Sequence, residues 1–409
     1  MPHSILASVT LGYEPIWNRW RKRCGVRLLV DTDTPDTVDA RHLLAALSDL
    51  WPGSSHPLVL SVRPAALLQG LLTQPPRPGI WIEVPDPHLS DTLFAGQVRK
   101  AHQQGLPLVW RGAPGQAPPP AAQAWFHKTL RSLTPQEALQ ALRVSLRQHQ
   151  ASAMGAAAGP LHSPVVAGSL YEGLASPALV EHALDRQSAW GVVGWPAEEV
   201  LHAYRFKQIQ PARHLVLALV QAIDADESME TIEHRMGDEP LLTYRFLRYA
   251  NSAGLGLLRD IDSVRQGLMA MGYTKLRTWL MEQLPHASSD PNLDPIRATL
   301  VLRARIMERL ADAGVEDELR REVFLCGIFS QVDLLLGEPL GAAILHLPLP
   351  GRVASAILGQ TGPYAPWLEV AAALESGSTR VIREVCKAHQ MAPGEVNRAL
   401  LRTLAASAL

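Results

Sequence analysis

Residue types that bind metals or act as nucleophiles are present in this chain, but they are scattered. Cys24, Cys326 and Cys386 lie far apart, are odd in number and have no metal-ligand spacing. No Walker-type glycine loop, GxSxG elbow or CxxC pair occurs in the sequence. The histidines of the second half fall in different expected helices, at His214, His234, His286, His346 and His389. We therefore predict no metal site, no cofactor and no catalytic residues.

One polar pair, Asn251 and Ser252, ends the apolar stretch DEPLLTYRFLRYANSAG over residues 238–254. Asn tolerates left-handed backbone geometry, and both side chains can bond to freed backbone groups, so the pair is typical of a helix-ending turn. The alternative is a surface that recognises a partner, because Arg and Tyr are enriched at interface hot spots. The candidate residues of this surface are Arg248, Tyr249, Asn251, Ser252 and Arg259.

The elements that must position these residues change character near residue 205. Before it, eight short apolar runs alternate with helical segments, and several runs show no polar alternation. Such runs are typical of strands buried on both faces of a parallel sheet. The expected strands lie at 5–11, 26–31, 58–62, 79–84, 107–110, 124–130, 163–170 and 190–195. Eight strands with mostly helical crossovers predict an α/β fold, a (β/α)8 barrel.

Two connections in this barrel should depart from the regular pattern. The first two strands are joined by NRWRKRCG, residues 18–25, which is too short for a crossover helix and predicts an antiparallel pair. Residues 112–123 read GAPGQAPPPAAQ, a Pro/Gly loop in which no helix could persist. The basic hairpin turn itself is expected to be solvated.

After residue 205 the sequence reads as about ten consecutive short helices, many of them ending in Gly. The expected division is therefore a barrel domain over residues 1–203 and an all-α domain over residues 204–409. The junction between them has helical spacing and no Gly/Ser-rich linker.

The two halves each resemble a known family. The stretch at 238–254, followed by SVRQGLMAMGYTKLRTWL at 263–280, resembles the core of an HDOD domain, the metal-less relative of the HD phosphohydrolases. The first strand pair, LGYEPIWNRWRKRCGVRLLVD at 11–31, resembles that of an EAL domain, the fold of cyclic di-GMP phosphodiesterases. Together they resemble the EAL-HDOD arrangement of bacterial signalling proteins.

The EAL resemblance implies metal-binding positions, and most of them carry unsuitable residues. The second-strand Glu falls on Arg27, and the third-strand Asn falls near Val59. The paired Asp residues of the fifth strand fall near Trp110 and Arg111, and the seventh-strand Glu falls near Ala167. Glu83 keeps a matching carboxylate, while Lys128 is an ambiguous match for the sixth-strand Lys. One carboxylate cannot build a two-metal site.

Glu172 could pass for a catalytic acid, but without a partner carboxylate we interpret it as a loop residue. The helical half fails the corresponding test, because the dipeptide His-Asp that HD hydrolases require occurs nowhere in the chain. We therefore predict that the protein is not an enzyme.

Composition limits the partners. A net charge of −1 gives no basic field, so DNA is not expected. The start of the chain has no secretory pattern, and no apolar run is long enough to cross a bilayer. With its separated cysteines the chain is expected in the cytoplasm.

These observations predict a regulatory protein that acts through protein partners, with an inactive EAL-like barrel and a metal-less HDOD domain. A homo-oligomer is compatible with this role. The alternative is a sensor that binds cyclic di-GMP or another nucleotide at the barrel mouth without cleaving it. Its candidate ligand-binding residues are Arg27, Glu83 and Arg111, since Arg presents a planar fork of donors to phosphate.

Overall fold

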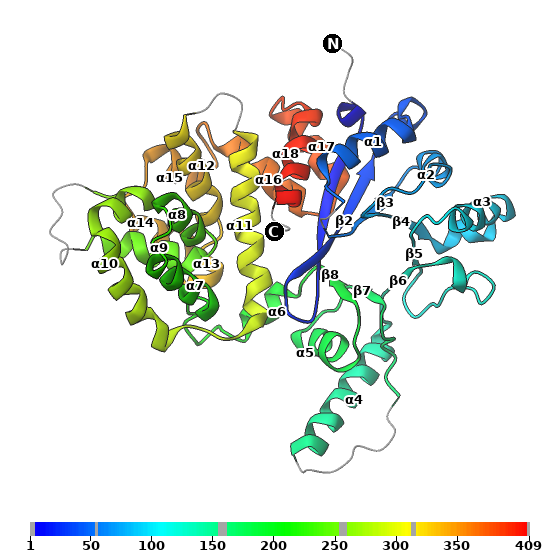
Figure 1. The fold of residues 1–409 in the computed structure, drawn as a ribbon, viewed down its shortest axis with the longest axis horizontal. Helices are drawn as coiled ribbons and strands as arrows, with labels where there is room; N and C mark the ends of the chain where they lie inside the picture. Colours follow the sequence, from blue (N-terminus) through cyan, green and yellow to red (C-terminus); the bar gives the residue numbers. More distant parts are fainter. Residues whose placement is uncertain (1–4, 54–55, 154–161, 253–259, 312–315, 407–409) are drawn as a thin grey trace. The chain divides into compact units, whose positions relative to one another are not determined.

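The first half of the chain is a closed barrel of eight strands (Figure 1). The computed structural model describes residues 5–53, 56–153, 162–252, 260–311 and 316–406. The strands are β1 Thr10–Trp17, β2 Arg23–Asp31, β3 Leu58–Val62, β4 Ile80–Pro85, β5 Leu108–Arg111, β6 Lys128–Arg131, β7 Leu170–Glu172 and β8 Gly191–Val193. β1 pairs antiparallel with β2 and β8, and the other neighbours are parallel. The predicted barrel and its antiparallel first pair are confirmed.

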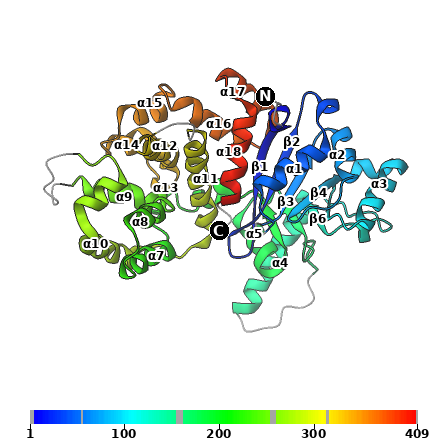
Figure 2. The same ribbon diagram turned by 45° about the horizontal axis from the view of Figure 1, so that its top comes forward.

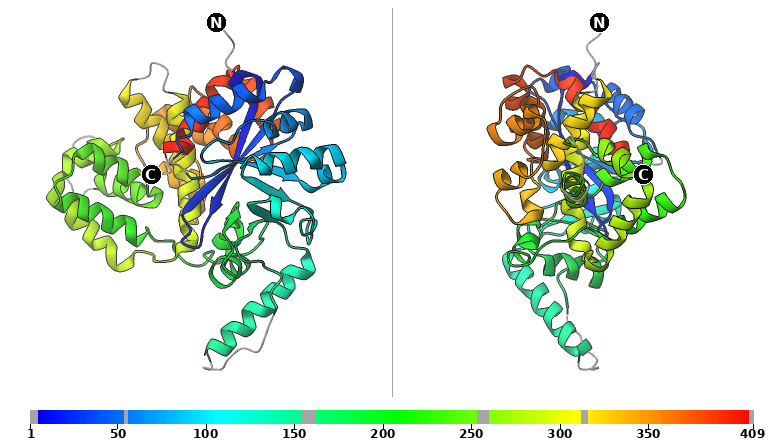
Figure 3. Two further views of the ribbon diagram at one scale, coloured as in Figure 1. Left: turned by 45° about the vertical axis from the view of Figure 1, so that its right-hand side comes forward. Right: turned by 90° about the vertical axis from the view of Figure 1, so that its left-hand side faces the viewer.

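Helices cover the outside of the barrel. They are α1 Ala40–Leu50, α2 Ala65–Leu72, α3 Thr92–Gln103, α4 Pro135–Ala153, α5 Pro177–Glu181 and α6 Ala197–His202. Between β5 and β6 the structure has a single 3-10 turn, Gln123–Trp125, as the Pro/Gly loop predicts. α4 extends away from the strands (Figure 3).

Three strands differ from their expected positions. The sixth, expected at 124–130, begins only at Lys128, after the 3-10 turn Gln123–Trp125. The expected first strand at 5–11 begins instead as a 3-10 turn over Ile5–Ser8, and β1 runs from Thr10 to Trp17. The expected seventh strand at 163–170 is displaced toward the C-terminus, to Leu170–Glu172. Apolar content alone does not mark where a strand begins, because a buried turn has the same composition.

Two C-terminal helices, α17 Thr379–Ala388 and α18 Pro393–Ala406, pack against β1 (Figure 2). The β1–β2 hairpin has no crossover helix of its own, so its outer face needs another cover. The buried Asn397 fastens α18 to this strand edge, because it accepts a hydrogen bond from the Leu11 amide and donates to the carbonyls of Leu6 and Val9. Thr379 donates to Asp31 at the end of β2 and holds α17 in the same way.

The chain therefore forms two compact units, residues 1–199 with 373–409, and residues 200–372. The first division lies close to the expected boundary at 203. The C-terminal 37 residues differ from the expectation, since they belong with the barrel. The divisions fall within α6 and within α16, but the helical spacing expected for the first junction continues only to His202, and residues 203–211 form turns and coil.

The second unit is helical. Its helices are α7 Arg213–Asp224, α8 Met229–Gly237, α9 Pro240–Ala250, α10 Val264–Gln283, α11 Asp294–Leu310, α12 Asp317–Phe329, α13 Asp333–Leu336, α14 Leu340–Leu345, α15 Gly351–Gly359 and α16 Ala365–Glu375. The expected apolar face of α9 is buried, including Leu241, Phe246 and Leu247. α10 is broken at Gly272, whose φ of 69° with ψ of 167° is accessible essentially to glycine alone.

Candidate functional site

The barrel interior holds a cluster of charged side chains around Arg27. Arg27 lies in the middle of β2 and forms two parallel hydrogen bonds with Glu83 of β4, Nε to Oε2 and Nη2 to Oε1, each 2.7 Å long. Ser61 of β3 accepts from Arg27 Nη2 at 3.3 Å and donates to Glu83 at 3.0 Å. Arg27 is 5% exposed and Glu83 is 1% exposed, so this is a buried, bidentate ion pair.

Two further carboxylates complete the cluster from other strands. Glu14 of β1 lies opposite Arg27 in the strand register and accepts a hydrogen bond from Arg27 Nη1 at 2.9 Å. Glu172, the last residue of β7, accepts from the same nitrogen at 3.0 Å. Arg111, the last residue of β5, donates to Glu172 at 3.0 Å and lies 3.8 Å from Glu83. The ends of β5 and β7 place this cluster toward the carboxyl ends of the parallel strands, where barrel enzymes bind their ligands.

All five N–H donors of Arg27 are therefore engaged inside the barrel. Burial by itself would lower the pKa of Arg27. The charge and hydrogen bonds of Glu83, together with the charges of Glu14 and Glu172, outweigh burial and raise this pKa above its usual value. Arg27 is thus a fixed internal cation.

The cluster does not fit a divalent metal ion. Glu14, Glu83 and Glu172 are carboxylates of the kind that hold Mg²⁺ or Mn²⁺, but the Arg27 guanidinium lies within 3.0 Å of all three. A second cation in this space would meet direct charge repulsion. Within the described part of the chain, no group of three or more His, Cys, Asp or Glu side chains is placed to hold a metal ion.

The predicted residues Arg27, Glu83 and Arg111 are brought together, whereas Glu14 and Glu172 were missed. Glu172 was interpreted from the sequence as a loop residue, and this interpretation is wrong. Glu172 ends β7 and has two arginine partners. Ala167, the expected seventh-strand position, is exposed and precedes the strand. The sequence signal that could have identified the cluster residue of β7 was Glu172 itself, the polar residue at the end of the short run LYE.

Lys128 does not join the cluster. It begins β6, and its ammonium lies 5.7 Å from the centre of the Trp190 ring. Val59 and Trp110 are fully buried, and the Trp110 indole donates to Asp86 at 2.8 Å. Val59 and Trp110 are therefore core residues that pack the barrel.

In the second unit, the Asn251 side chain joins the end of α9 to Ile261 by hydrogen bonds. Its Nδ2 donates to the carbonyls of Leu247 and Ile261, and its Oδ1 accepts from the Ile261 amide, each at 2.8 Å. Asn251 is the C-cap of α9 with φ of −96°, so it ends the helix without adopting the left-handed geometry that Asn tolerates. Asn251 acts here as an architectural residue, because all of these bonds are internal.

The other residues of the candidate partner surface have different surroundings. Arg248 is exposed with its guanidinium over the Tyr244 ring, and Tyr249 stacks on Trp279 while staying 37% exposed. Ser252 is exposed. Arg259 lies outside the described residues.

A buried ion pair that the sequence reasoning missed supports α9 at its other end. Glu239 accepts from the Leu242 amide as the N-cap of α9 and lies 2.9 Å from the Arg297 Nε of α11. Both residues are almost completely buried. Burial raises the pKa of Glu239, and the charge of Arg297 opposes this rise. Arg297 also donates to the Gln210 carbonyl, so one pair joins α9, α11 and the chain before α7.

The histidines of this unit are not arranged as ligands. His214 and His234 are exposed and lie 4.0 Å and 3.8 Å from single carboxylates, those of Asp294 and Asp238. Asp333 begins α13 and burial raises its pKa.

No helix among the described residues is long and apolar enough to cross a membrane.

Comparison with known proteins agrees with this architecture. Residues 210–336 match the family model of the HDOD domain. The protein YuxH of Bacillus subtilis is 28% identical over 141 residues, which are 34% of this chain and 34% of YuxH. The cyclic di-GMP phosphodiesterase CdgJ of Vibrio cholerae is 24% identical over 155 residues, 38% of this chain and 36% of CdgJ. The matches thus span about a third of each of these relatives.

Solved structures with similarity to this chain include a response regulator and EAL enzymes. MmoQ from Methylococcus capsulatus has a TM-score of 0.39 at 16% identity, covering 48% of this chain and 98% of MmoQ. The manganese and cyclic di-GMP complex of Klebsiella pneumoniae BlrP1 has a TM-score of 0.30 at 14% identity, covering 48% of this chain and 56% of BlrP1. The cGMP-bound EAL enzyme Bd1971 has a TM-score of 0.30 at 13% identity, covering 46% of this chain and 60% of Bd1971.

The chain is thus a two-part protein, in which a closed eight-stranded barrel precedes a helical unit. Residues 210–336 of that helical unit are an HDOD domain, as the resemblance at 238–280 predicts.

Proposed function

We propose that this protein is a non-catalytic signalling protein related to cyclic di-GMP pathways, and that it acts by binding other proteins. The observation that carries this proposal is the Arg27 guanidinium, held by Glu83, Glu14 and Glu172 in the barrel interior. The relationship to the phosphodiesterase CdgJ supports the choice of pathway.

Loss of hydrolysis follows from the chemistry of the cluster. Metal-dependent cleavage of a phosphodiester needs cations that activate water and neutralise the phosphate. Arg27 pairs with all three carboxylates that could bind such ions, and a guanidinium cannot lower the pKa of a water molecule as a bound metal does. The barrel keeps its fold by using an arginine as its internal cation.

The alternative role, a nucleotide sensor at the barrel mouth, has weaker support. Phosphate would need free donors, but those of Arg27 are all engaged, and Arg111, which is 40% exposed, has its Nε on Glu172 and only its Nη groups left to offer. Three carboxylates and two guanidinium groups leave the cluster with one net negative charge, which repels an anion.

Binding of a protein partner would use the surface of the HDOD domain. Arg248 and Tyr249 in the last turn of α9, and Ser252 just after it, are exposed, and Asn251 between them is bonded to Ile261. Exposed Arg and Tyr side chains on a helix are suited to protein recognition, because the backbone that carries them is already ordered before binding.

The test of inactivity uses the purified full chain with cyclic di-GMP and either Mg²⁺ or Mn²⁺. We expect no linear product with either ion, and neither ion should raise the melting temperature. Metal-dependent turnover that disappears in a folded Glu83→Gln variant would overturn the proposal. Tight calorimetric binding of cyclic di-GMP that Arg111→Gln removes would favour the sensor role.

The test of partner binding compares Arg248→Ala with Arg19→Ala, an exposed arginine of the β1–β2 turn. We expect both variants to melt like the wild type, and only Arg248→Ala to lose proteins that co-purify with the wild-type chain. Equal recovery from both variants would remove this surface from the proposal.

A further inference from the structure

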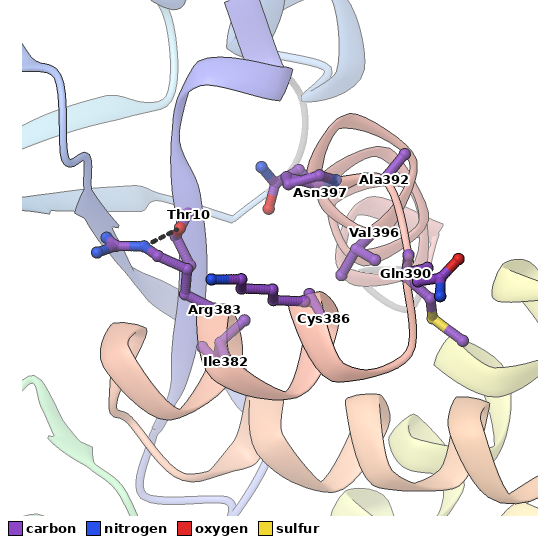
Figure 4. Close-up of a pocket in the computed structure, with 11 residues that line it drawn as sticks. Thr10, Ile382, Arg383, Cys386, Gln390, Ala392, Val396 and Asn397 are labelled. Atoms are coloured by element: carbon purple, nitrogen blue, oxygen red, sulfur yellow. Dashed lines mark hydrogen bonds between the residues drawn. The ribbon is translucent and has the colours of Figure 1, made fainter.

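A pocket of about 380 Å³ lies within the barrel unit between α17, α18 and β1 (Figure 4). Ile382 and Cys386 border it from α17, and Val396 borders it from α18. Thr10 of β1 closes one side, and the connection from Gln390 to Pro393 forms another. This volume is in the range of small-molecule sites, roughly 300–1,000 Å³. The charged cluster around Arg27 contributes no residue to it.

The floor of this pocket is apolar. Ile382 and Val396 are buried, at 1% and 2% exposure. The polar atoms of Asn397 are all used by backbone groups of residues 6, 9 and 11. Burial also raises the pKa of the Cys386 thiol, so the sulfur remains neutral. A ligand would meet hydrocarbon and a neutral thiol at the bottom of the site.

The edge of the pocket carries two cations with different surroundings. Arg383 is balanced by Asp31 and Asp33, with which it forms ion pairs, and it also donates to Thr10. Lys387 is exposed, and none of the ion pairs among the described residues uses its ammonium. Lys387 therefore supplies the uncompensated positive charge at this edge.

We propose that this pocket binds a small hydrophobic carboxylate, with its hydrocarbon part between Ile382 and Val396 and its carboxylate at Lys387. Apolar contact supplies most of the affinity, because the floor offers no hydrogen bonds. Charge complementarity with Lys387 selects an acid over a neutral molecule of the same shape.

Occupancy of the site would affect the barrel. The ligand would bridge α17 and α18, the two helices that cover the β1–β2 hairpin. A molecule that binds only the folded arrangement stabilises it by mass action. The proposal of a ligand in this pocket does not depend on the proposed lack of catalysis, because the pocket shares no residue with the cluster around Arg27.

The experiment uses octanoate as the acid and 1-octanol as its neutral control, with the full chain labelled at Ile and Val methyl groups. We expect saturable shifts of the Ile382 and Val396 methyl signals with octanoate. Signals of Ile16 and Val59, which lie in the barrel interior, should stay unchanged. Lys387→Gln changes only an exposed side chain, so it should fold normally. It should weaken octanoate binding about fivefold and leave 1-octanol binding unchanged, as expected for a partly exposed ion pair.

Three outcomes would overturn the proposal. The first is the absence of saturable Ile382 and Val396 shifts at millimolar octanoate. The second is equal octanoate affinity in the wild type and Lys387→Gln. A Val396→Phe variant fills the pocket, and if it folds it should abolish binding of both compounds. Retained binding in that folded variant would place the ligand elsewhere and reject this site.

Discussion

Arg27 is a buried cation that three carboxylates share in the barrel interior. Taking Glu83 and Arg27 out of water costs several kcal/mol for each ion, and their bidentate contact offsets this cost. Removing the cation alone leaves a carboxylate of 1% exposure with only the Ser61 hydroxyl at 3.0 Å and the more distant Arg111 at 3.8 Å. The energetic consequence is much larger than for an exposed pair, which contributes about 0–1 kcal/mol.

We therefore expect Arg27→Met to reduce the free energy of unfolding by about 3–5 kcal/mol. The double variant Arg27→Met with Glu83→Met should recover much of this loss, since it removes both buried charges. Urea unfolding followed by circular dichroism measures both changes. Arg19→Met, at the exposed hairpin turn, is the matched control and should stay within about 0.5 kcal/mol of the wild type. Equal losses in the single and double variants would contradict an ion pair that matters for stability.

At the scale of elements, α9 is defined by polar residues at both of its ends. Glu239 caps its N-terminus and pairs with Arg297 of α11, while Asn251 joins its C-terminus to Ile261. Its apolar face packs into the helical unit between these two points. The helix is thus held at both of its ends, which fixes the position of the exposed side chains in its last turn.

We expect Asn251→Ala to lower the free energy of unfolding by about 1–3 kcal/mol, because it leaves the Ile261 carbonyl and amide without their partner and removes one of the two bonds to the Leu247 carbonyl. Asn251→Asp should be at least as damaging, since it places a carboxylate against the carbonyls of Leu247 and Ile261. Hydrogen exchange gives a local check, because the Ile261 amide should lose protection in both variants. Ser252→Ala, next to it in sequence and exposed, should keep that protection. Unchanged exchange of the Ile261 amide in Asn251→Ala would show that the Asn251–Ile261 hydrogen bonds do not stabilise this region.

For the whole molecule, the chain order and the compact units do not coincide. The chain leaves the barrel unit after residue 199, forms the helical unit, and returns at residue 373 to supply α17 and α18. These two helices take the place of the outer helix that the β1–β2 hairpin cannot provide. The barrel is therefore complete only when the C-terminal segment is present.

We expect a chain that ends at residue 372 to lose cooperative unfolding of its barrel and to aggregate, because the outer face of β1 and β2 becomes exposed. The matched variant replaces residues 200–372 with a long Gly/Ser linker and keeps α17 and α18. This variant should retain a cooperative thermal transition by circular dichroism. A truncated chain whose barrel unfolds as cooperatively as the matched variant would show that α17 and α18 are dispensable.

Much of the fold follows from the sequence by itself, because strands and helices are encoded in local patterns. The apolar runs at 58–62 and 79–84 predict β3 and β4 closely, and the short basic connection at 18–25 predicts the antiparallel hairpin. The Pro/Gly loop at 112–123 predicts the missing helix. The residues around 238–280 were sufficient to predict an HDOD domain. In each case the signal lies within one segment.

Partners and packing were decided by the tertiary structure alone. Glu172 reads as an isolated acid because its partner Arg27 is 145 residues away in sequence. The helix-ending role of Asn251 can be read from its own segment, but its partner Ile261 cannot, because it lies ten residues further along the chain. The amphipathic pattern of α17 and α18 shows that each buries one face, but it does not show against what. The bond from Leu11 to Asn397, across 386 residues, assigns that face to the barrel.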